Sequence, residues 1–409
     1  MIKYFDTMIS GIETAIRTNP EGAGPRKKFA LEILRLGKRL YTKGNDTAWC
    51  GIAVPFDILN AMDITSCFVE FVGATLASNG VVGPFLEAGE QAGYGTDGCS
   101  YHRSVMGAAA RGLVPEPRFF IGTTTPCTGG IAVLENLSRI FKREMFVLQV
   151  PMDASGSNVK FLASRIRDMV GFIENKTGKK LDPGRLREAV TYSNEASALM
   201  AQVYELAKKV PSPAGGRDLG NFGIIMPLFS GTKTGVEIAK NFKDDFQKRI
   251  DLGESGVAGE KIRLLWIQNR IQFKNPLVKM LEEEYHASVV IDEFNNITWE
   301  PIDVNNPFES MAARSISIPF NGPVENRISH LKRLCREYRV DGAINPSNWG
   351  CRQGSGARGL IEESLKDIGV PVINLEVDCV DTRSFAEGQI RTRLEAFLEM
   401  IGSRPSPWK

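Results

Sequence analysis

Short apolar runs alternate with segments of helical periodicity along most of the chain. The first half contains runs typical of buried strands at residues 49–54, 65–72, 118–124 and 145–150. The second half contains similar runs at residues 263–267, 287–291, 340–344 and 372–377. Because helix-compatible segments separate successive runs, each group predicts a parallel sheet with helices on its faces.

The remaining segments have a helical pattern and set the expected domain boundaries. Residues 1–45 predict helices, and residues 158–248 carry long polar and apolar periodicity. We therefore expect an α/β protein with two Rossmann- or flavodoxin-like parallel-sheet domains and a helical linking region. The expected divisions are an N-terminal helical segment at 1–45, a first α/β domain at 46–157, the linking region at 158–255 and a second α/β domain at 256–409.

Composition narrows the class of protein. With 50 basic and 48 acidic residues the formal net charge is +2, which favours neither a nucleic-acid partner nor a membrane surface. No segment reaches the roughly 20 consecutive apolar residues of a membrane-spanning helix, and the N-terminus lacks a secretory pattern. Seven scattered cysteines argue against a disulfide framework. We expect a cytoplasmic protein.

Three of the cysteines lie where an open α/β sheet binds its ligands. Cys127 follows the strand at 118–124, Cys351 follows the strand at 340–344, and Cys99 stands in a glycine-bounded loop. The two halves of the chain repeat the order of strand, cysteine, helix and strand, so Cys127 and Cys351 would meet across one cleft. Thiolates are soft ligands suited to iron, and three of them leave one iron of a cubane open. The pattern favours an iron–sulfur cluster.

Other interpretations of these residues stay open. His102 follows Cys99 by three positions, so a Cys3His zinc site competes with the cluster. Cys50 is a candidate fourth ligand or a pocket wall. The other cysteines are expected to be core or structural thiols: Cys67, Cys335 and Cys379.

Two glycine-containing segments could bind a phosphate. Residues 350–359 open a helix beside Arg352, and residues 230–235 include Lys233. Either segment could equally be an ordinary helix start. Neither has the strand, GxxxxGK[ST] and helix order of a P-loop, so the chain is not expected to bind ATP in that way.

Taken in order, the motifs resemble those of the 2-hydroxyacyl-CoA dehydratase and benzoyl-CoA reductase family. The resemblance spans residues 49–400, and its motifs are Gly98-Cys99-Ser100-Tyr101, Thr125-Pro126-Cys127, Gly350-Cys351-Arg352, Glu376-Val377-Asp378, Asp381-Thr382-Arg383-Ser384-Phe385 and Arg391-Thr392-Arg393-Leu394-Glu395. The ordered set is far more specific than any one motif.

The resemblance implies an iron–sulfur subunit similar to the dehydratase D-component. Cys99, Cys127 and Cys351 would hold a [4Fe-4S] cluster between the two domains. A related second subunit or a second copy would pair with the chain, and a separate ATP-hydrolysing iron–sulfur activator would supply a low-potential electron. In this anaerobic radical chemistry a lyase converts an (R)-2-hydroxyacyl-CoA to an enoyl-CoA through a ketyl radical. In the oxidoreductase branch, electrons reduce an aromatic or enoyl acyl-CoA.

One motif departs from the family pattern. Dehydratases carry hydroxyl side chains between the Trp and the Pro of the first motif, whereas this chain has none from Trp49 to Pro55. The expected substrate pocket comprises Trp49, Cys50, Gly51 and Ile52, with Lys233 and Arg352 as a basic rim. No catalytic residue is assigned, and the fourth iron ligand is either Cys50 or a non-protein group. A two-domain binding protein or zinc-stabilised protein without chemistry is the alternative from another class.

Overall fold

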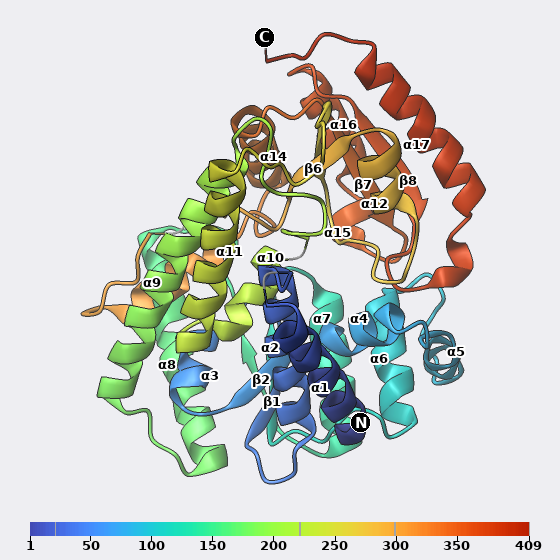
Figure 1. Ribbon diagram of the computed structural model, residues 1–409. Helices are drawn as coiled ribbons and strands as arrows, with labels where there is room; N and C mark the ends of the chain where they lie inside the picture. Colours follow the sequence, from blue (N-terminus) through green and yellow to red (C-terminus); the bar gives the residue numbers. More distant parts are fainter. Residues whose placement is uncertain (21, 221, 298–299, 409) are drawn as a thin grey trace.

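The computed structural model describes residues 1–20, 22–220, 222–297 and 300–408, and these contain two four-stranded parallel sheets (Figure 1). The first has the order β2-β1-β3-β4 and the second the order β6-β5-β7-β8. Their bounds are β1 (Thr47–Cys50), β2 (Thr65–Phe68), β3 (Phe119–Thr123), β4 (Met145–Leu148), β5 (Ile262–Trp266), β6 (Ala287–Asp292), β7 (Gly342–Asn348) and β8 (Val372–Val377). The predicted fold class is confirmed.

Helices surround each sheet and fill the stretch between them. Around the first sheet these are α1 (Ile2–Thr18), α2 (Pro25–Tyr41), α3 (Phe56–Ala61), α4 (Glu70–Ser78), α5 (Gly83–Gln91), α6 (Ser100–Ala110) and α7 (Thr128–Phe141). The connecting stretch forms α8 (Gly156–Thr177), α9 (Pro183–Ala207), α10 (Phe222–Ile225), η1 (Met226–Phe229) and α11 (Lys233–Asp251). The second sheet has α12 (Leu277–Lys279), η2 (Met280–Glu284), α13 (Pro307–Ile316), α14 (Val324–Glu337), α15 (Arg352–Ser355), α16 (Arg358–Lys366), η3 (Thr382–Ser384) and α17 (Glu387–Gly402). In the described part of the chain, no helix combines the length and apolar character that crossing a bilayer requires.

Three strands end four residues away from the predicted position. The run at 65–72 divides into β2 and the first turn of α4, because a continuously buried run carries no period that separates strand from helix. The run at 49–54 ends as a strand at Cys50. Strand β7 continues past the predicted 340–344 through Pro346, where β5 has already ended, so the missing N–H of Pro346 costs no hydrogen bond to β5.

One hydrophobic core extends through most of the molecule. It joins the first sheet, the connecting helices and one face of the second sheet, where Leu265, Val290 and Ala343 belong to it. A second, smaller core lies between the other face of the second sheet and α17, with Ile344 and Leu394 as members. The loops at the ends of the two sheets are therefore held at defined positions relative to each other.

Candidate functional site

A cavity of about 650 Å³ lies between the carboxyl ends of the two sheets. Its wall is made by loops that follow β1, β2 and β3 in one sheet and β5 and β7 in the other. Ile52, Cys127, Gln268 and Cys351 come from four of these loops. In both sheets the first and third strands are neighbours, and this is the switch point at which open parallel sheets bind ligands.

Cys99, Cys127 and Cys351 all line this cavity. Each is the N-cap residue of a helix, α6, α7 or α15 respectively. Backbone N–H groups of the following turn lower the pKa of each thiol against the effect of burial, and they belong to His102 for the first, Gly129 and Gly130 for the second, and Gln353 and Gly354 for the third. N–H groups at a helix start favour a thiolate, so the backbone is arranged to hold three anionic sulfurs.

The loop of Cys351 contacts the loops of both other cysteines. A Cβ atom on Gly350 would lie 2.3 Å from the carbonyl oxygen of Gly98, so only glycine permits this approach. The side-chain Nε2 of Gln353 donates to the carbonyl oxygen of Pro126 at 2.5 Å. These two contacts bring segments more than 200 residues apart in the chain to one place.

His102 and Glu70 complete the contact between the first two loops. A Cβ atom on Gly129 would lie 3.2 Å from the imidazole ring of His102, next to Cys127. His102 Nε2 and Glu70 Oε1 are 3.0 Å apart and form a hydrogen-bonded pair. The other oxygen of Glu70 is buried and has no hydrogen-bond partner among the described residues, and Glu70 lines the cavity.

A buried ion pair supports the loop that follows Cys351. Arg327 on α14 donates from Nη2 to Glu293 Oε2 at 2.9 Å and also donates to the carbonyl oxygen of Gln353. Glu293 accepts in addition from the backbone N–H of Gln268 at 2.8 Å. Both charged side chains are almost completely buried, so each is neutralised only by its partner and these hydrogen bonds.

Burial sets the protonation of the three free thiols. It raises the pKa of Cys99, Cys127 and Cys351 above the ordinary value for cysteine. The carboxylate of Glu70 raises the pKa of Cys99 and Cys127 further, whereas Arg327 lowers that of Cys351. Without a metal the sites hold neutral thiols, and a bound cation would release their protons.

The donor set fits an iron–sulfur cluster. Three thiols line one cavity, and each belongs to the N-cap residue of a helix. In a cubane each thiolate binds its own iron, so the ligands lie farther apart than around a single ion. Within the described ranges, no three His, Cys, Asp or Glu side chains gather as a single metal ion requires. Ligation by these cysteines stays a prediction.

The segment expected to form the substrate pocket contributes only its end. Ile52 lines the cavity, and the wall continues from there to Asp57. Trp49 and Cys50 are instead buried in β1, where the indole Nε1 donates to the carbonyl oxygen of Pro115 at 3.1 Å. Neither lines the cavity, nor does Gly51, where a Cβ atom would lie 2.3 Å from Thr123 Oγ1. Trp49 and Cys50 point to opposite faces of the first sheet, and both faces are covered, so both side chains lie in the core.

The remaining cysteines separate into two groups. Cys50 and Cys67 are electrostatic neighbours on β1 and β2, and Cys335 is buried on α14. Cys379 is fully buried beside Cys99 and Cys351, and its thiol donates to the carbonyl oxygen of Asn269 at 3.5 Å. Of the other cysteines in the described residues, Cys379 is therefore the one beside these thiols, although it does not line the cavity.

The expected basic rim lies elsewhere. Lys233 begins α11 with its ammonium 3.9 Å from Glu237, and Arg352 begins α15 with its side chain exposed. Neither residue lines the cavity. Residues 230–235 form a helix start in which Thr232 Oγ1 accepts from the N–H of Gly235 at 3.1 Å. The N–H of Gly235 is therefore already used in capping α11, and this segment is an ordinary helix start.

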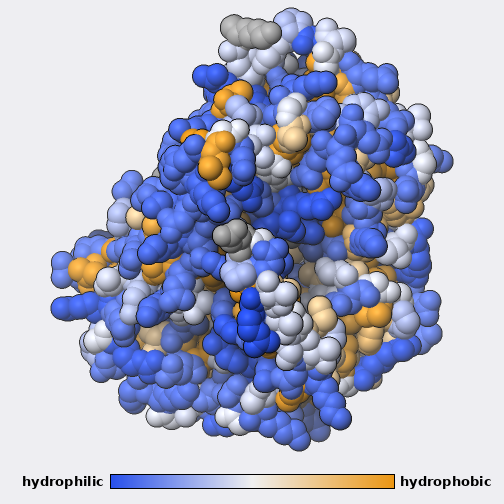
Figure 2. All heavy atoms as spheres, viewed as in Figure 1, coloured by the Kyte–Doolittle hydropathy of each residue, from blue (hydrophilic) through white to orange (hydrophobic). Residues whose placement is uncertain are grey.

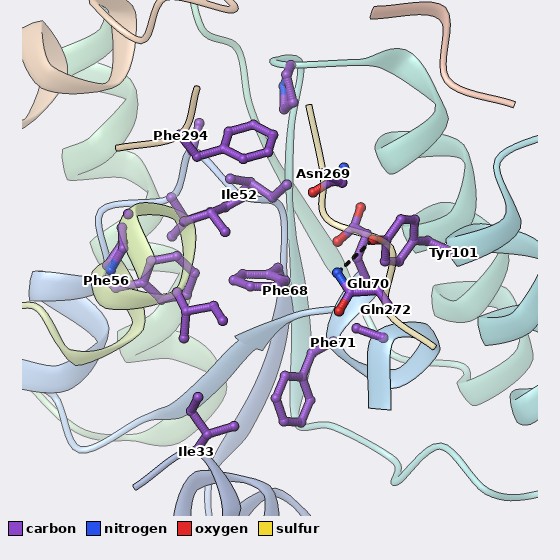
Figure 3. A pocket seen from close by; sticks show the side chains of 18 of the residues that line it. Ile33, Ile52, Phe56, Phe68, Glu70, Phe71, Tyr101, Asn269, Gln272 and Phe294 are labelled. Atoms are coloured by element: carbon purple, nitrogen blue, oxygen red, sulfur yellow. Dashed lines mark hydrogen bonds between the residues drawn. The ribbon is translucent and has the colours of Figure 1, made fainter. Parts of the chain in front are cut away.

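The cavity has an apolar side and a polar side. Figure 3 shows Phe56, Phe68, Phe71 and Phe294 pointing into one space together with Ile33 and Ile52. Glu70, Tyr101, Asn269 and Gln272 lie together on the other side, where Gln272 Nε2 donates to the Tyr101 hydroxyl at 3.0 Å. Such a cavity suits a ligand with a large apolar part and a polar reacting group.

The family model of the 2-hydroxyglutaryl-CoA dehydratase D-component matches residues 52–401. The chain belongs to this family. The (R)-phenyllactyl-CoA dehydratase alpha subunit of Clostridium sporogenes is 25% identical over 373 residues, which cover 88% of this chain and 90% of that protein. One subunit of benzoyl-CoA reductase from Thauera aromatica is 26% identical over 383 residues, 86% of each chain. The alpha subunit of lactoyl-CoA dehydratase from Anaerotignum propionicum is 23% identical over 390 residues, 88% of this chain and 91% of that protein.

Membership in the D-component family confirms the resemblance found in the sequence. The chain is an enzyme subunit of the dehydratase or benzoyl-CoA reductase type, not a binding protein without chemistry. Sequence reasoning missed Glu70, Tyr101 and Gln272, which face the cavity beside the cysteines. Glu70 stands directly after the apolar run of β2, and a single charged residue at a strand end was its only signal.

Proposed function

We propose that this D-component family member is the iron–sulfur subunit of an ATP-activated cytoplasmic enzyme that dehydrates an (R)-2-hydroxyacyl-CoA to an enoyl-CoA. In this proposal Cys99, Cys127 and Cys351 hold a [4Fe-4S] cluster. The observation that carries it is that all three thiols line one cavity whose opposite side is apolar. Free, unpaired cysteines throughout the chain accord with a reducing compartment.

The cluster, when bound, supplies a low-potential electron and an open iron that polarises the thioester carbonyl. The chain itself contributes position and environment. Backbone N–H groups at three helix starts favour the thiolates. Such groups near the ligand sulfurs would also tune the reduction potential of a bound cluster. The phenylalanine wall excludes water from the acyl group, so charges on the polar side interact strongly.

Glu70 is positioned to move the substrate proton. One carboxylate oxygen is bound to His102 at 3.0 Å, which orients the group, and the other has no partner among the described residues. A carboxylate with one free oxygen in the cavity wall fits a general base that removes the proton at C3 of the acyl chain. His102 acts here as a positioning residue, through Glu70.

A second candidate is reduction of an aromatic acyl-CoA by a subunit of the benzoyl-CoA reductase type. The aromatic side chains that line the cavity favour it, because planar rings pack well against phenylalanine faces. The two branches would make different products, namely an enoyl-CoA by loss of water and a cyclic diene by addition of two electrons and two protons. Product analysis separates them.

We further propose two protein partners. The relatives are themselves named as subunits, which supports a related second subunit, or else a second copy of this chain. The electron would come from a separate ATP-hydrolysing iron–sulfur activator, since this sequence has no P-loop. Activity is expected only when activator, ATP and reductant are all present.

Anaerobic purification with the partner subunit tests the proposal. We expect a brown protein with equal amounts of iron and sulfide, and loss of most iron in each of Cys99→Ser, Cys127→Ser and Cys351→Ser. Cys335→Ser is the matched control, because that thiol is buried on α14 away from the cavity. Wild-type iron content and an unchanged EPR spectrum in all three cavity variants would refute the ligand assignment.

A further inference from the structure

Three arginines lie close together beside the cavity, and two of them have no carboxylate within ion-pair distance among the residues that the structure describes. Arg26 is the second residue of α2, Arg217 lies in the loop before α10, and Arg270 lies in the loop after β5. All three reach solvent. Arg26 and Arg270 make no side-chain hydrogen bond or ion pair with any residue that the structure describes, and the nearest carboxylate to Arg217 is that of Glu282 at 3.9 Å.

The three guanidinium groups repel one another. The protein packed around Arg270 lowers its pKa by desolvation, and Arg26 and Arg217 lower it further, while Tyr101 and Asp292 oppose them. Desolvation likewise lowers the pKa of Arg26, and Arg217 adds to that effect although nearby acids oppose it. A group of like charges kept in a crowded surface costs folding free energy and is typical of a ligand site.

The two acids that raise the pKa of Arg26 are Asp218 and Glu282, and each already accepts a hydrogen bond from another donor. Asp218 accepts from Arg249 Nη1 at 2.8 Å and from the backbone N–H of Gly215 at 3.0 Å. Glu282 accepts from the backbone N–H of Gly216 at 3.0 Å. These carboxylates stabilise the loop that carries Arg217, so an excess of positive charge remains for a ligand.

The arginines are continuous with the cavity. Arg270 stands between Asn269 and Gln272, which line it, and it is an electrostatic neighbour of Tyr101 on the cavity wall. A Cβ atom on Gly220 would lie 3.8 Å from the Arg270 side chain, so the loop of Arg217 contacts that of Arg270. In Figure 1 the start of α2 meets α10 near the middle of the molecule, and Figure 2 shows hydrophilic residues around a hollow there.

We propose that Arg26, Arg217 and Arg270 bind the phosphate groups of the coenzyme A moiety. This inference rests on the proposed function. An acyl-CoA carries its thioester at one end of the pantetheine arm and its phosphates at the other. The entrance of the acyl cavity should therefore be positively charged. Guanidinium groups bind phosphate oxygens in pairs, which a lysine cannot do. The arginines take the role that the sequence suggested for Lys233 and Arg352.

Binding of a non-reacting thioester tests the inference on the complete, anaerobically prepared complex. The ligands are 3-phenylpropanoyl-CoA and the pantetheine thioester of the same acid, titrated by calorimetry. We expect Arg26→Gln and Arg270→Gln to weaken CoA-thioester binding by about tenfold or more each, and to leave pantetheine-thioester binding within about twofold. Arg187→Gln is the control, because Arg187 is an exposed arginine on α9 outside the cavity wall.

The variants also test folding directly. Because the arginines repel, removing one should leave the melting temperature unchanged or raise it. CoA-thioester binding of wild-type strength in both variants and in Arg217→Gln would overturn this inference alone. A second result would also overturn it: the wild-type complex binds ATP, and the variants lose ATP binding while they keep acyl-CoA binding. The arginines would then be a site for free nucleotides. A wild-type complex that binds neither thioester would overturn the proposed function as well.

Discussion

Replacing Gly350 by alanine should separate two of the three cysteine loops. The new Cβ atom would lie 2.3 Å from the carbonyl oxygen of Gly98 and 2.7 Å from the backbone nitrogen of Cys99. Real Cβ contacts essentially never fall below 3.0 Å, so the loops must move apart by at least about 0.7 Å. Backbone atoms cannot rotate away as a flexible side chain would. We expect a loss of about 1–3 kcal/mol in the free energy of unfolding, as for overpacked cores.

The assay combines denaturant unfolding with iron analysis of the anaerobic protein. Gly350→Ala should lose most of its iron, since the sulfurs of Cys99 and Cys351 no longer hold their spacing. Gly359→Ala on α16 is the matched control, because a Cβ atom there meets nothing within 4 Å and alanine favours the helix by up to about 1 kcal/mol. Gly350→Ala with wild-type stability and wild-type iron would refute the contact between the loops.

Three further variants test other parts of the site. Glu70→Gln should keep its iron but lower turnover by roughly 10²-fold or more, because the amide cannot accept the proton; wild-type turnover would exclude Glu70 as the base. Arg327→Met should lose about 3–5 kcal/mol in unfolding free energy by leaving Glu293 buried and unpaired, and Arg327→Met/Glu293→Leu should recover much of it; equal stability of the two would contradict this account. Cys50→Ala should retain both iron and acyl-CoA selectivity, since that thiol is buried in β1 outside the cavity wall; loss of iron would make it a ligand.

The strands could be predicted because buried apolar runs stand out between helical segments. Both sheets and the positions of Cys127 and Cys351 after their third strands follow from that pattern. The ends of the runs were harder to predict: Phe71 and Val72 are as apolar as β2 but belong to α4. A short apolar run without periodicity fits a strand and a buried helix equally well, so its period does not show where the strand ends and the helix begins.

The walls of the site could not be predicted from local pattern. Trp49 and Cys50 precede Ile52 by only a few positions, yet both are buried, because both faces of β1 are covered. Arg26 and Arg270 are single charged residues in unrelated segments, and only the fold brings them together. The contact of Gly350 with Gly98 likewise joins distant loops. Such tertiary approaches leave no periodic trace in a sequence.

The shared core has a consequence for how a substrate enters. Leu265 and Val290 of the second sheet belong to the same buried cluster as the first sheet. A hinge motion that separates the two sheets would therefore expose that cluster to water. Admission must instead depend on small surface elements. Helix α1 is such an element: Phe5, Met8 and Ile12 line the cavity, and Phe5 is the one fully buried side chain of this helix among those described. Displacing a single peripheral helix requires far less free energy than separating the two domains. Substrate can therefore enter the cavity quickly while the cysteine loops stay rigid.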